Sequence, residues 1–262
     1  MEIASINLVY FSATYTTRKI ARLIAREFTG EKKEYDITPA SPDHPVILGK
    51  DDLLIAGMPV YAGRIPISAF HALNQFKGKN TPAIIICVYG NRDYDDALLE
   101  LKEIVESNGF LVISAGAFIA QHSIFPEAGA NRPDEKDTLL IKEFANTSSK
   151  ILLNLKDTSL PEAISVKGNN PYKIPGKIPF QPKGSKKCNE CGSCVKLCPV
   201  EAIPKDNPRK TDKEKCISCG RCIVVCPQNA RNFRGLLYKV VAKKFINTYS
   251  TRKEPETMFS KL

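Results

Sequence analysis

Eight of the nine cysteines in this 262-residue chain lie in one short stretch and obey one spacing rule. Two copies of C-x2-C-x2-C-x3-C-P, offset by 28 residues, contain Cys188, Cys191, Cys194 and Cys198, and then Cys216, Cys219, Cys222 and Cys226. Three cysteines two residues apart wrap a tight loop in which each thiolate reaches a different metal atom, whereas the fourth begins a helix and points away. The pattern therefore indicates metal or redox chemistry rather than a disulfide framework.

The doubled motif resembles that of bacterial ferredoxins with two 4Fe-4S clusters. In such proteins the fourth cysteine of each motif ligates the other cluster. The resemblance thus implies one cluster on Cys188, Cys191, Cys194 and Cys226, and a second on Cys216, Cys219, Cys222 and Cys198. Zinc is the alternative metal, but it rarely takes three cysteines at this spacing followed by Cys-Pro.

Basic residues concentrate in the same part of the chain. Residues 166–262 hold 21 Lys and Arg against 7 Asp and Glu, which leaves 17 against 21 for residues 1–165. Two oxidised clusters with their thiolates would cancel about four of the excess positive charges. We expect the remainder to face a redox protein that is acidic at its docking face. Nucleic acid or anionic lipid is the general alternative for a basic region, and we expect no nucleic-acid partner.

The preceding part of the chain alternates strand and helix. Apolar runs of strand length and apolar positions at helical spacing follow one another five times. The expected strands are 3–11, 34–37, 52–57, 83–89 and 110–117, and the expected helices are 16–28, 67–76, 94–107 and 134–155. This order predicts an α/β doubly wound sheet of five parallel strands, followed by a small α+β cluster domain. Cys87, in the fourth strand, is expected to be a small buried hydrophobe.

Composition divides the chain into four parts. We expect the sheet domain at 1–157, a proline-rich linker at 158–183, the cluster domain at 184–232, and a basic amphipathic helix and tail at 233–262. The linker should lie along the first domain, because Tyr172, Ile174, Ile178 and Phe180 are too apolar for a free tether. The helix is expected to pack on its own protein; binding to a membrane surface or a partner is the alternative.

Hydroxyl side chains crowd the turn after the first strand. This turn, Ser12, Ala13, Thr14, Tyr15, Thr16 and Thr17, resembles the flavodoxin phosphate loop, with Tyr15 in place of a glycine and Thr16 in place of an asparagine. Hydroxyls and backbone N–H groups at a helix N-terminus can hold a phosphate dianion. A glycine permits close backbone approach and unusual φ angles, both of which Tyr15 should give up. Simple capping of the helix is the alternative role of the turn.

Two more loops follow the third and fourth strands, at the sheet edge where nucleotides bind in such folds. They resemble the ring-binding loops of flavodoxin domains that are fused to ferredoxins. The resemblance implies flavin mononucleotide (FMN), with Tyr61 and Tyr94 stacking on the ring. The remaining candidates in these loops are Pro59, Ala62, Gly63, Tyr89, Gly90, Asn91 and Asp95. His122 follows the fifth strand near the same edge, and we expect a structural, hydrogen-bonded role for it.

Taken whole, the chain resembles the flavodoxin-ferredoxin fusion proteins of anaerobic bacteria and archaea. The resemblance implies an electron carrier that links two 4Fe-4S clusters, FMN and a partner redox protein. A flavin-dependent oxidoreductase with a small substrate is the alternative, although no catalytic residue stands out. A sheet domain that has lost its flavin and serves for docking is the third possibility. With no signal peptide and no apolar run long enough to span a bilayer, the protein is expected in the cytoplasm.

Overall fold

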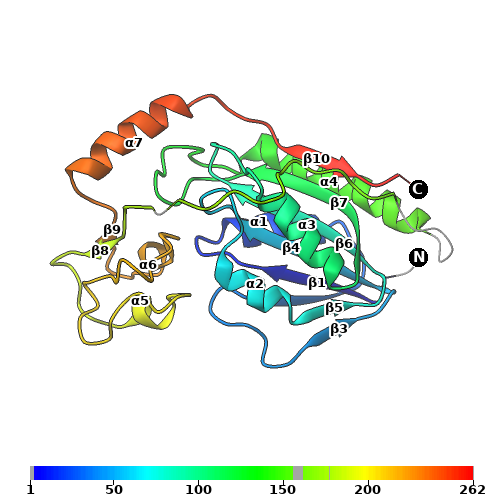
Figure 1. Cartoon of the computed structure of the whole chain (residues 1–262), viewed down its shortest axis with the longest axis horizontal. Helices are drawn as coiled ribbons and strands as arrows, with labels where there is room; N and C mark the ends of the chain where they lie inside the picture. The colour runs from blue at the N-terminus through cyan, green and yellow to red at the C-terminus, as the bar shows by residue number, and fades with distance from the viewer. Residues whose placement is uncertain (1–2, 156–161, 177, 262) are drawn as a thin grey trace.

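The computed structural model describes residues 3–155, 162–176 and 178–261. The chain forms a larger α/β domain and a smaller lobe beside it, and helix α7 (Leu236–Thr248) extends from the small lobe back toward the large domain (Figure 1). The expected boundary between residues 157 and 158 lies outside the described residues.

The larger domain is built on a twisted parallel sheet. Its strands are β1 (Ser5–Tyr10), β2 (Glu31–Asp36), β4 (Asp52–Pro59), β6 (Thr81–Tyr89) and β7 (Phe110–Ile119). They lie side by side in the order β2-β1-β4-β6-β7, and every neighbouring pair is parallel. This is the strand order of flavodoxin-like folds. The expected doubly wound parallel sheet is therefore confirmed.

A sixth strand, β10 (Glu256–Phe259), was not expected from the sequence. It comes from the end of the chain and pairs antiparallel with β7, so the tail completes the sheet edge. Two short strands, β3 (Val46–Leu48) and β5 (Phe76–Gly78), form a separate parallel pair.

Helices cover both faces of the sheet. On one face α1 (Thr16–Ala25) and α4 (Glu135–Asn154) pack against each other and against the strands, whereas α2 (Ile67–Leu73) and α3 (Ala97–Ser107) belong to the other face. Strand β6 is buried on both sides: Ile84 and Ile86 point to the first core, and Ile85 and Cys87 to the second. Cys87 is thus a buried apolar side chain, and burial raises the pKa of its thiol.

The smaller lobe repeats one small unit. Helices α5 (Ser193–Lys196) and α6 (Arg221–Val224) follow equivalent glycines, Gly192 and Gly220, whose φ angles are 76° and 77°. Only glycine adopts this left-handed conformation without steric cost. The strands β8 (Lys183–Gly184) and β9 (Arg231–Asn232) pair antiparallel beside the two helices. The lobe is therefore the expected α+β domain.

The described part of the linker lies along the larger domain, as expected. Asp96 accepts hydrogen bonds from the backbone N–H groups of Asn169 and Lys173 at 2.8 and 2.6 Å. The guanidinium of Arg64 lies over the ring of Tyr172 at 4.3 Å. Ile174, by contrast, is exposed. Residues 158–161 of the predicted linker are outside the described part.

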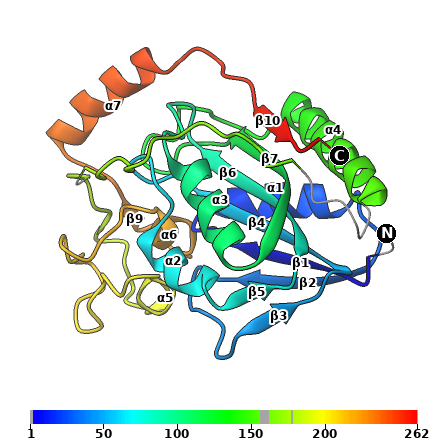
Figure 2. The same ribbon diagram turned by 45° about the vertical axis from the view of Figure 1, so that its right-hand side comes forward.

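Helix α7 has two apolar faces with different surroundings. Tyr238, Val241 and Phe245 pack against Phe125 and Phe180, whereas three apolar residues on another face are exposed: Leu236, Leu237 and Val240. Figure 2 shows the chain running from this helix to β10 at the sheet edge. Among the described residues, no helix has both the length and the apolar character needed to cross a membrane.

Candidate functional site

In the small lobe, cysteines of the first motif lie near cysteines of the second. The Cys194 thiol has its pKa raised first by burial and also by the nearby thiols of Cys188 and Cys226. Burial likewise raises the pKa of Cys219 to about 12, and its neighbouring thiols include Cys198 from the first motif. Cys226 thus neighbours a cysteine of the first motif and Cys198 a cysteine of the second, while the assignment of all eight cysteines to two clusters stays a prediction.

Backbone N–H groups point at the crossing cysteines in both halves of the repeat. Ala202 donates to Sγ of Cys198 at 3.3 Å, and Ala230, 28 residues later, donates to Sγ of Cys226 at 3.2 Å. Hydrogen bonds to ligand sulfurs stabilise the charged form and tune a cluster's potential. Among the described residues, no group of three or more His, Cys, Asp or Glu side chains is spaced to hold a single metal ion.

The second motif faces the sheet domain. Cys219 belongs to the same packed core as Phe11, and Tyr61 and Ile217 pack against that core. Burial raises the pKa of the Tyr61 hydroxyl well above its usual value, and Cys219 contributes to this shift. The cluster set that contains Cys219 therefore lies directly against the sheet domain.

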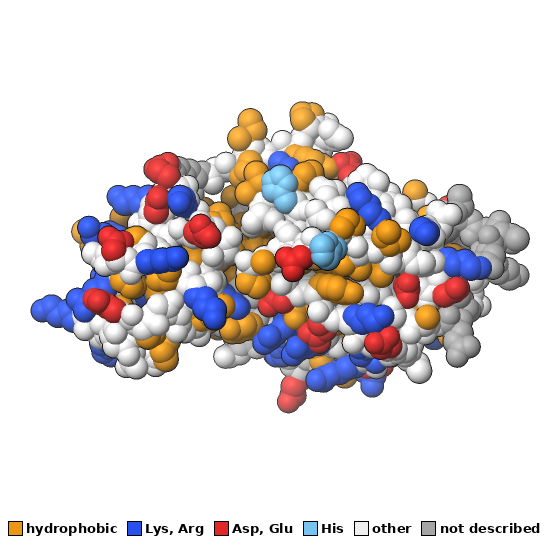
Figure 3. Space-filling view, turned by 90° about the horizontal axis from the view of Figure 1, so that it is seen from below, with side chains coloured by type: hydrophobic (Ala, Val, Ile, Leu, Met, Phe, Trp, Pro, Cys, Tyr) orange, Lys and Arg blue, Asp and Glu red, His pale blue; other side chains and the backbone are white. Residues whose placement is uncertain are grey.

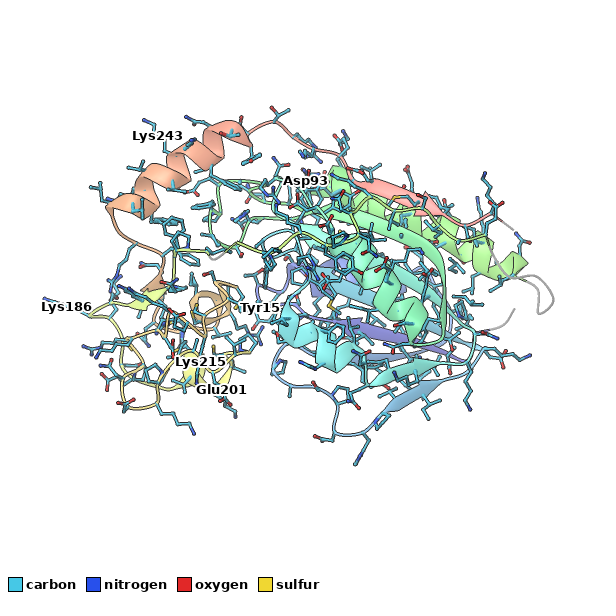
Figure 4. All side chains as sticks on the ribbon, in the orientation of Figure 1. Tyr15, Asp93, Lys186, Glu201, Lys215 and Lys243 are labelled. Atoms are coloured by element: carbon cyan, nitrogen blue, oxygen red, sulfur yellow. The ribbon has the colours of Figure 1, made fainter. Side chains whose placement is uncertain are left out.

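Arg221 fixes this junction. Its Nη1 donates to the carbonyl oxygens of Ser12 and Ala13 at 3.4 and 3.3 Å. The guanidinium groups of Arg18 and Arg221 both contact the ring of Tyr15, at 4.6 and 4.7 Å from its centre. Figure 4 shows Tyr15 where the two domains meet. The candidate phosphate loop is therefore also a docking surface for the small lobe.

The loop itself retains free hydrogen-bond donors. Oγ of Ser12 accepts from the N–H of Arg18 at 3.0 Å, so the serine does cap part of the helix. Tyr15 provides no side-chain cap for α1, and among the described residues the N–H groups of Thr16 and Thr17 have no acceptor. Such unpaired N–H groups at a helix N-terminus attract anions.

Tyr15 corrects one expectation from the sequence. Its φ of 67° is left-handed, so the residue keeps the unusual backbone conformation of a glycine despite its side chain. This conformation costs a non-glycine residue about 1–2 kcal/mol. The two cation–π contacts of the Tyr15 ring help to compensate for this cost.

A cavity of about 80 Å³ lies between this loop, the sheet edge and the second cysteine motif. The ends of β1, β4 and β6 and the loops after them line it, including Ala13, Thr14, Thr16, Thr17, Pro59, Tyr61, Ala62, Tyr89 and Gly90. Ile217 and Ser218 close it from the small lobe. Eight of the nucleotide-site candidates therefore meet at one cavity, with Ser12 and Tyr15 beside it in the phosphate loop.

Three candidates in the loop after β6, the fourth expected strand, lie away from the cavity. This corrects the site that was expected for the flavin ring. Tyr94 is buried in the core, where its hydroxyl donates to Glu256 of β10 at 2.6 Å. Nδ2 of Asn91 donates to the carbonyl oxygens of Tyr249 and Thr251 in the tail. Asp95 pairs with Arg92, next to Gly63. Neither these three residues nor Gly63 lines the cavity, and the C-terminal tail binds the side chains of Asn91 and Tyr94.

The loop after β7 supplies cavity residues that the sequence motifs did not predict. Gln121, His122, Ser123 and Ile124 all line it, and Ile178 joins them from the linker. Nδ1 of His122 accepts the N–H groups of Ile124 and Phe125, each at 3.1 Å. Burial lowers the pKa of His122 to about 4. The ring is therefore neutral at pH 7 and carries its proton on Nε2. Its place after the fifth strand was the only signal in the sequence.

Fold and site together define a redox protein in which a flavodoxin-like domain carries a ferredoxin-type domain for two clusters. Residues 187–230 match the family model of the 4Fe-4S dicluster domain. The comparison with curated proteins gives no match.

The solved structures that resemble this chain do so through its sheet domain. Rubredoxin oxygen:oxidoreductase from Desulfovibrio gigas is 17% identical with a TM-score of 0.44, over 58% of this chain and 37% of the oxidoreductase. An archaeal flavodoxin is 12% identical with a TM-score of 0.40, over 57% of this chain and 99% of its own. A Fusobacterium nucleatum flavodoxin mutant bound to flavin mononucleotide is 15% identical with a TM-score of 0.41, over 59% and 99%.

Proposed function

We propose that this protein carries electrons between two 4Fe-4S clusters and an FMN at the domain junction, and exchanges them with a partner redox protein. The observation that supports this proposal is the cavity itself. Its lining joins the candidate phosphate loop to Ile217 and Ser218, which lie between two cysteines of the second motif. A flavin at this place would lie beside the second cluster without any intervening domain.

The chain's residues fit the phosphate end of the nucleotide. The N–H groups of Thr16 and Thr17 are available, and the hydroxyl oxygens of Thr14 and Thr16 lie 3.4 Å apart at the same turn. The positive end of the α1 dipole adds to the attraction for a dianion. Arg221 and Arg18 flank the loop and add positive charge.

The ring end has one clear candidate face, the side chain of Tyr61, with the backbone of Gly90 beside it. The cavity of about 80 Å³ is smaller than the roughly 300–1,000 Å³ of typical ligand pockets. A flavin ring would therefore need more room than this cavity gives. A bound flavin would supply a centre that takes one or two electrons; Tyr61 would orient it, and the neutral His122 could donate a hydrogen bond from Nε2.

The first cluster set offers the route to a partner. Cys191 is exposed, as are Lys186 and Lys187 just before the first motif. Lys186 lies at the outer end of the small lobe in Figure 4. Such a surface attracts an acidic partner through long-range electrostatics. Electrons would then pass from the partner to the outer cluster, on to the inner cluster, and finally to the cavity.

The test is an anaerobic assay of iron, sulfide and flavin per chain. We expect about eight irons and one flavin, and reduction of the clusters should bleach the flavin without an added mediator. A Thr17→Val variant should retain iron and bind flavin more weakly, because it removes a hydroxyl from the candidate phosphate loop, which lines the cavity, and leaves every cysteine in place. Thr147→Val is the matched control, since Thr147 is exposed on α4. Protein that contains all its iron but neither retains nor binds FMN would contradict the flavin part of the proposal.

The small cavity and the bonds of Arg221 to the loop carbonyls favour one alternative. In it, the flavodoxin-like domain holds no flavin and serves to dock the cluster domain. This alternative predicts full iron content, no yellow cofactor after extraction, and electron exchange with protein carriers only. The same assay therefore separates the two functions.

A further inference from the structure

Arg231 is a buried cation inside the cluster domain. Its side chain is 2% exposed, and its guanidinium is anchored by backbone oxygens of separate segments. Nη2 donates to Pro182 O at 2.9 Å, Nη1 donates to Pro208 O, and both donate to Lys210 O at 3.4 Å. Among the described residues, no carboxylate forms an ion pair with it. A buried charge held only by dipoles calls for a negative partner.

The internal repeat provides a matched comparison. Arg231 stands five residues after Cys226, and Ile203 stands five residues after Cys198. Ile203 is 4% exposed and packs with Cys194 and Cys222. An apolar side chain thus suffices for packing at this position in one half, so packing alone does not account for an arginine in the other.

Arg231 lies beside cysteines of both implied cluster sets. It directly follows Ala230, whose N–H donates to Sγ of Cys226 at 3.2 Å. Strand β9, which contains Arg231, packs against helix α6, which contains Cys222 of the other set. The cation is therefore shared between the two cluster sites.

One donor of this guanidinium is unused. Nε of Arg231 is buried and has no hydrogen-bond acceptor among the described residues. Buried N–H groups rarely remain unpaired in native proteins. Sulfur atoms of a loaded cluster are the acceptors that this site would add.

We propose that Arg231 raises the reduction potentials of both clusters by holding a fixed positive charge between them. Reduction adds one electron, and hence one negative charge, to a cluster. A nearby cation in a poorly solvated site stabilises the reduced state more than the oxidised one. The proposal rests on the cluster part of the proposed function and is independent of the flavin.

An anaerobic redox titration monitored by electron paramagnetic resonance tests it. In fully loaded Arg231→Met, the ratio of reduced to oxidised cluster at a fixed potential should fall about tenfold for each cluster, or about 59 mV for one electron. Arg231→Lys should keep most of the wild-type potential. Arg234→Met, which removes an exposed and solvated charge, should have little effect. Unchanged potentials in loaded Arg231→Met would overturn the proposal.

A second measurement does not depend on folding of the neutral variant. Pulsed resonance on reduced wild-type protein with ¹⁵N-labelled arginine should detect a guanidinium nitrogen coupled to the clusters. The coupling should disappear in Arg231→Lys and persist in Arg221→Lys. Wild-type clusters without such a coupling would also overturn the proposal. Protein with full iron and no flavin leaves this inference intact, whereas protein without iron contradicts the proposed function itself.

Discussion

The two cysteine motifs share one spacing and differ in what surrounds them. Cys191 of the first motif is exposed, whereas its equivalent in the second, Cys219, is only 8% exposed. The equivalent glycines show the same contrast. A Cβ added at Gly192 would meet nothing within 4 Å, but at Gly220 it would lie 3.4 Å from Thr14 and from Ser123 of the sheet domain.

Under the proposed function, this difference would give the two halves different tasks. Figure 3 shows Lys and Arg side chains, with Asp and Glu side chains among them, on the surface of the small lobe, and Cys191 of the first motif is exposed. Cys219 of the second motif packs against the sheet domain. We therefore propose that the same ligand chemistry serves an outer site, open to a partner, and an inner site beside the cavity.

Removing one ligand from each motif gives the strongest test of this comparison. Cys191→Ala and Cys219→Ala should each lose one cluster, so iron should fall from about eight to about four per chain. Cys219→Ala should abolish reduction of the flavin in the cavity, because no inner cluster would remain to pass electrons to it. Cys191→Ala should stop electron entry from a protein donor but preserve exchange between the inner cluster and the flavin. Rapid-mixing absorbance measurements follow both steps, and equal behaviour of the two variants would refute the assigned order.

The inner position of the second motif also depends on the C-terminal tail, which returns from the small lobe to the sheet. Arg132 and Asp137 form a buried ion pair with a contact at 2.8 Å and side chains 5% and 2% exposed. Arg132 also donates to Lys253 O at 2.8 Å, and Arg252 reaches Asp137 at 3.0 Å. Asp137→Asn should therefore lower the free energy of unfolding by about 3–5 kcal/mol, because it leaves Arg132 buried without its partner.

Chemical denaturation measures this loss, and limited proteolysis should show the tail released before the sheet core. Lys136→Gln is the control, because it removes a neighbouring but exposed ion pair with Glu254. It should cost less than about 1 kcal/mol. Similar losses in both variants would show that the tail is not anchored by the buried pair.

His122 tests the same junction through pH. Burial lowers its pKa to about 4 from a usual 6.5, so the unfolded chain binds an extra proton between these values. The protein should therefore lose stability as the pH falls from about 6.5 to 4, by at most about 3 kcal/mol from this group. In His122→Asn, whose side chain does not titrate, the difference in melting temperature from wild type should shrink or reverse between pH 7 and pH 5. A difference that is constant with pH would contradict a buried, neutral His122.

Local patterns in the sequence predicted the parts of this molecule that depend on neighbouring residues. The cysteine spacing, the alternation of strand and helix and the hydroxyl-rich turn are local, and the structure places Thr14, Thr16 and Thr17 at one cavity. Strand β10 was missed because its four residues carry no clear alternation. It forms only through pairing with β7, more than a hundred residues earlier in the chain.

The error at Tyr94 has the same origin. A tyrosine in a loop beside a nucleotide site resembles a ring-stacking residue, and nothing nearby in the sequence indicates otherwise. Its hydroxyl partner, Glu256, belongs to β10, and Asn91 of the same loop binds the tail backbone. Contacts with a distant segment leave no local pattern in the sequence. Here the tail binds Asn91 and Tyr94 of this loop, and the motif gave no sign of it.

The smallest expected effect concerns Tyr15, whose ring contacts Arg221 of the second motif. Its φ of 67° costs a residue with a side chain about 1–2 kcal/mol, and glycine adopts it freely. Both Tyr15→Gly and Tyr15→Ala lose the ring that contacts Arg18 and Arg221, worth about 0.5–1 kcal/mol per contact. Only Tyr15→Ala keeps the strain, so Tyr15→Gly should be the more stable of the two by about 1 kcal/mol in denaturant unfolding. Equal stabilities would mean that the loop is not held left-handed, and that Arg221 docks the inner motif on a relaxed turn.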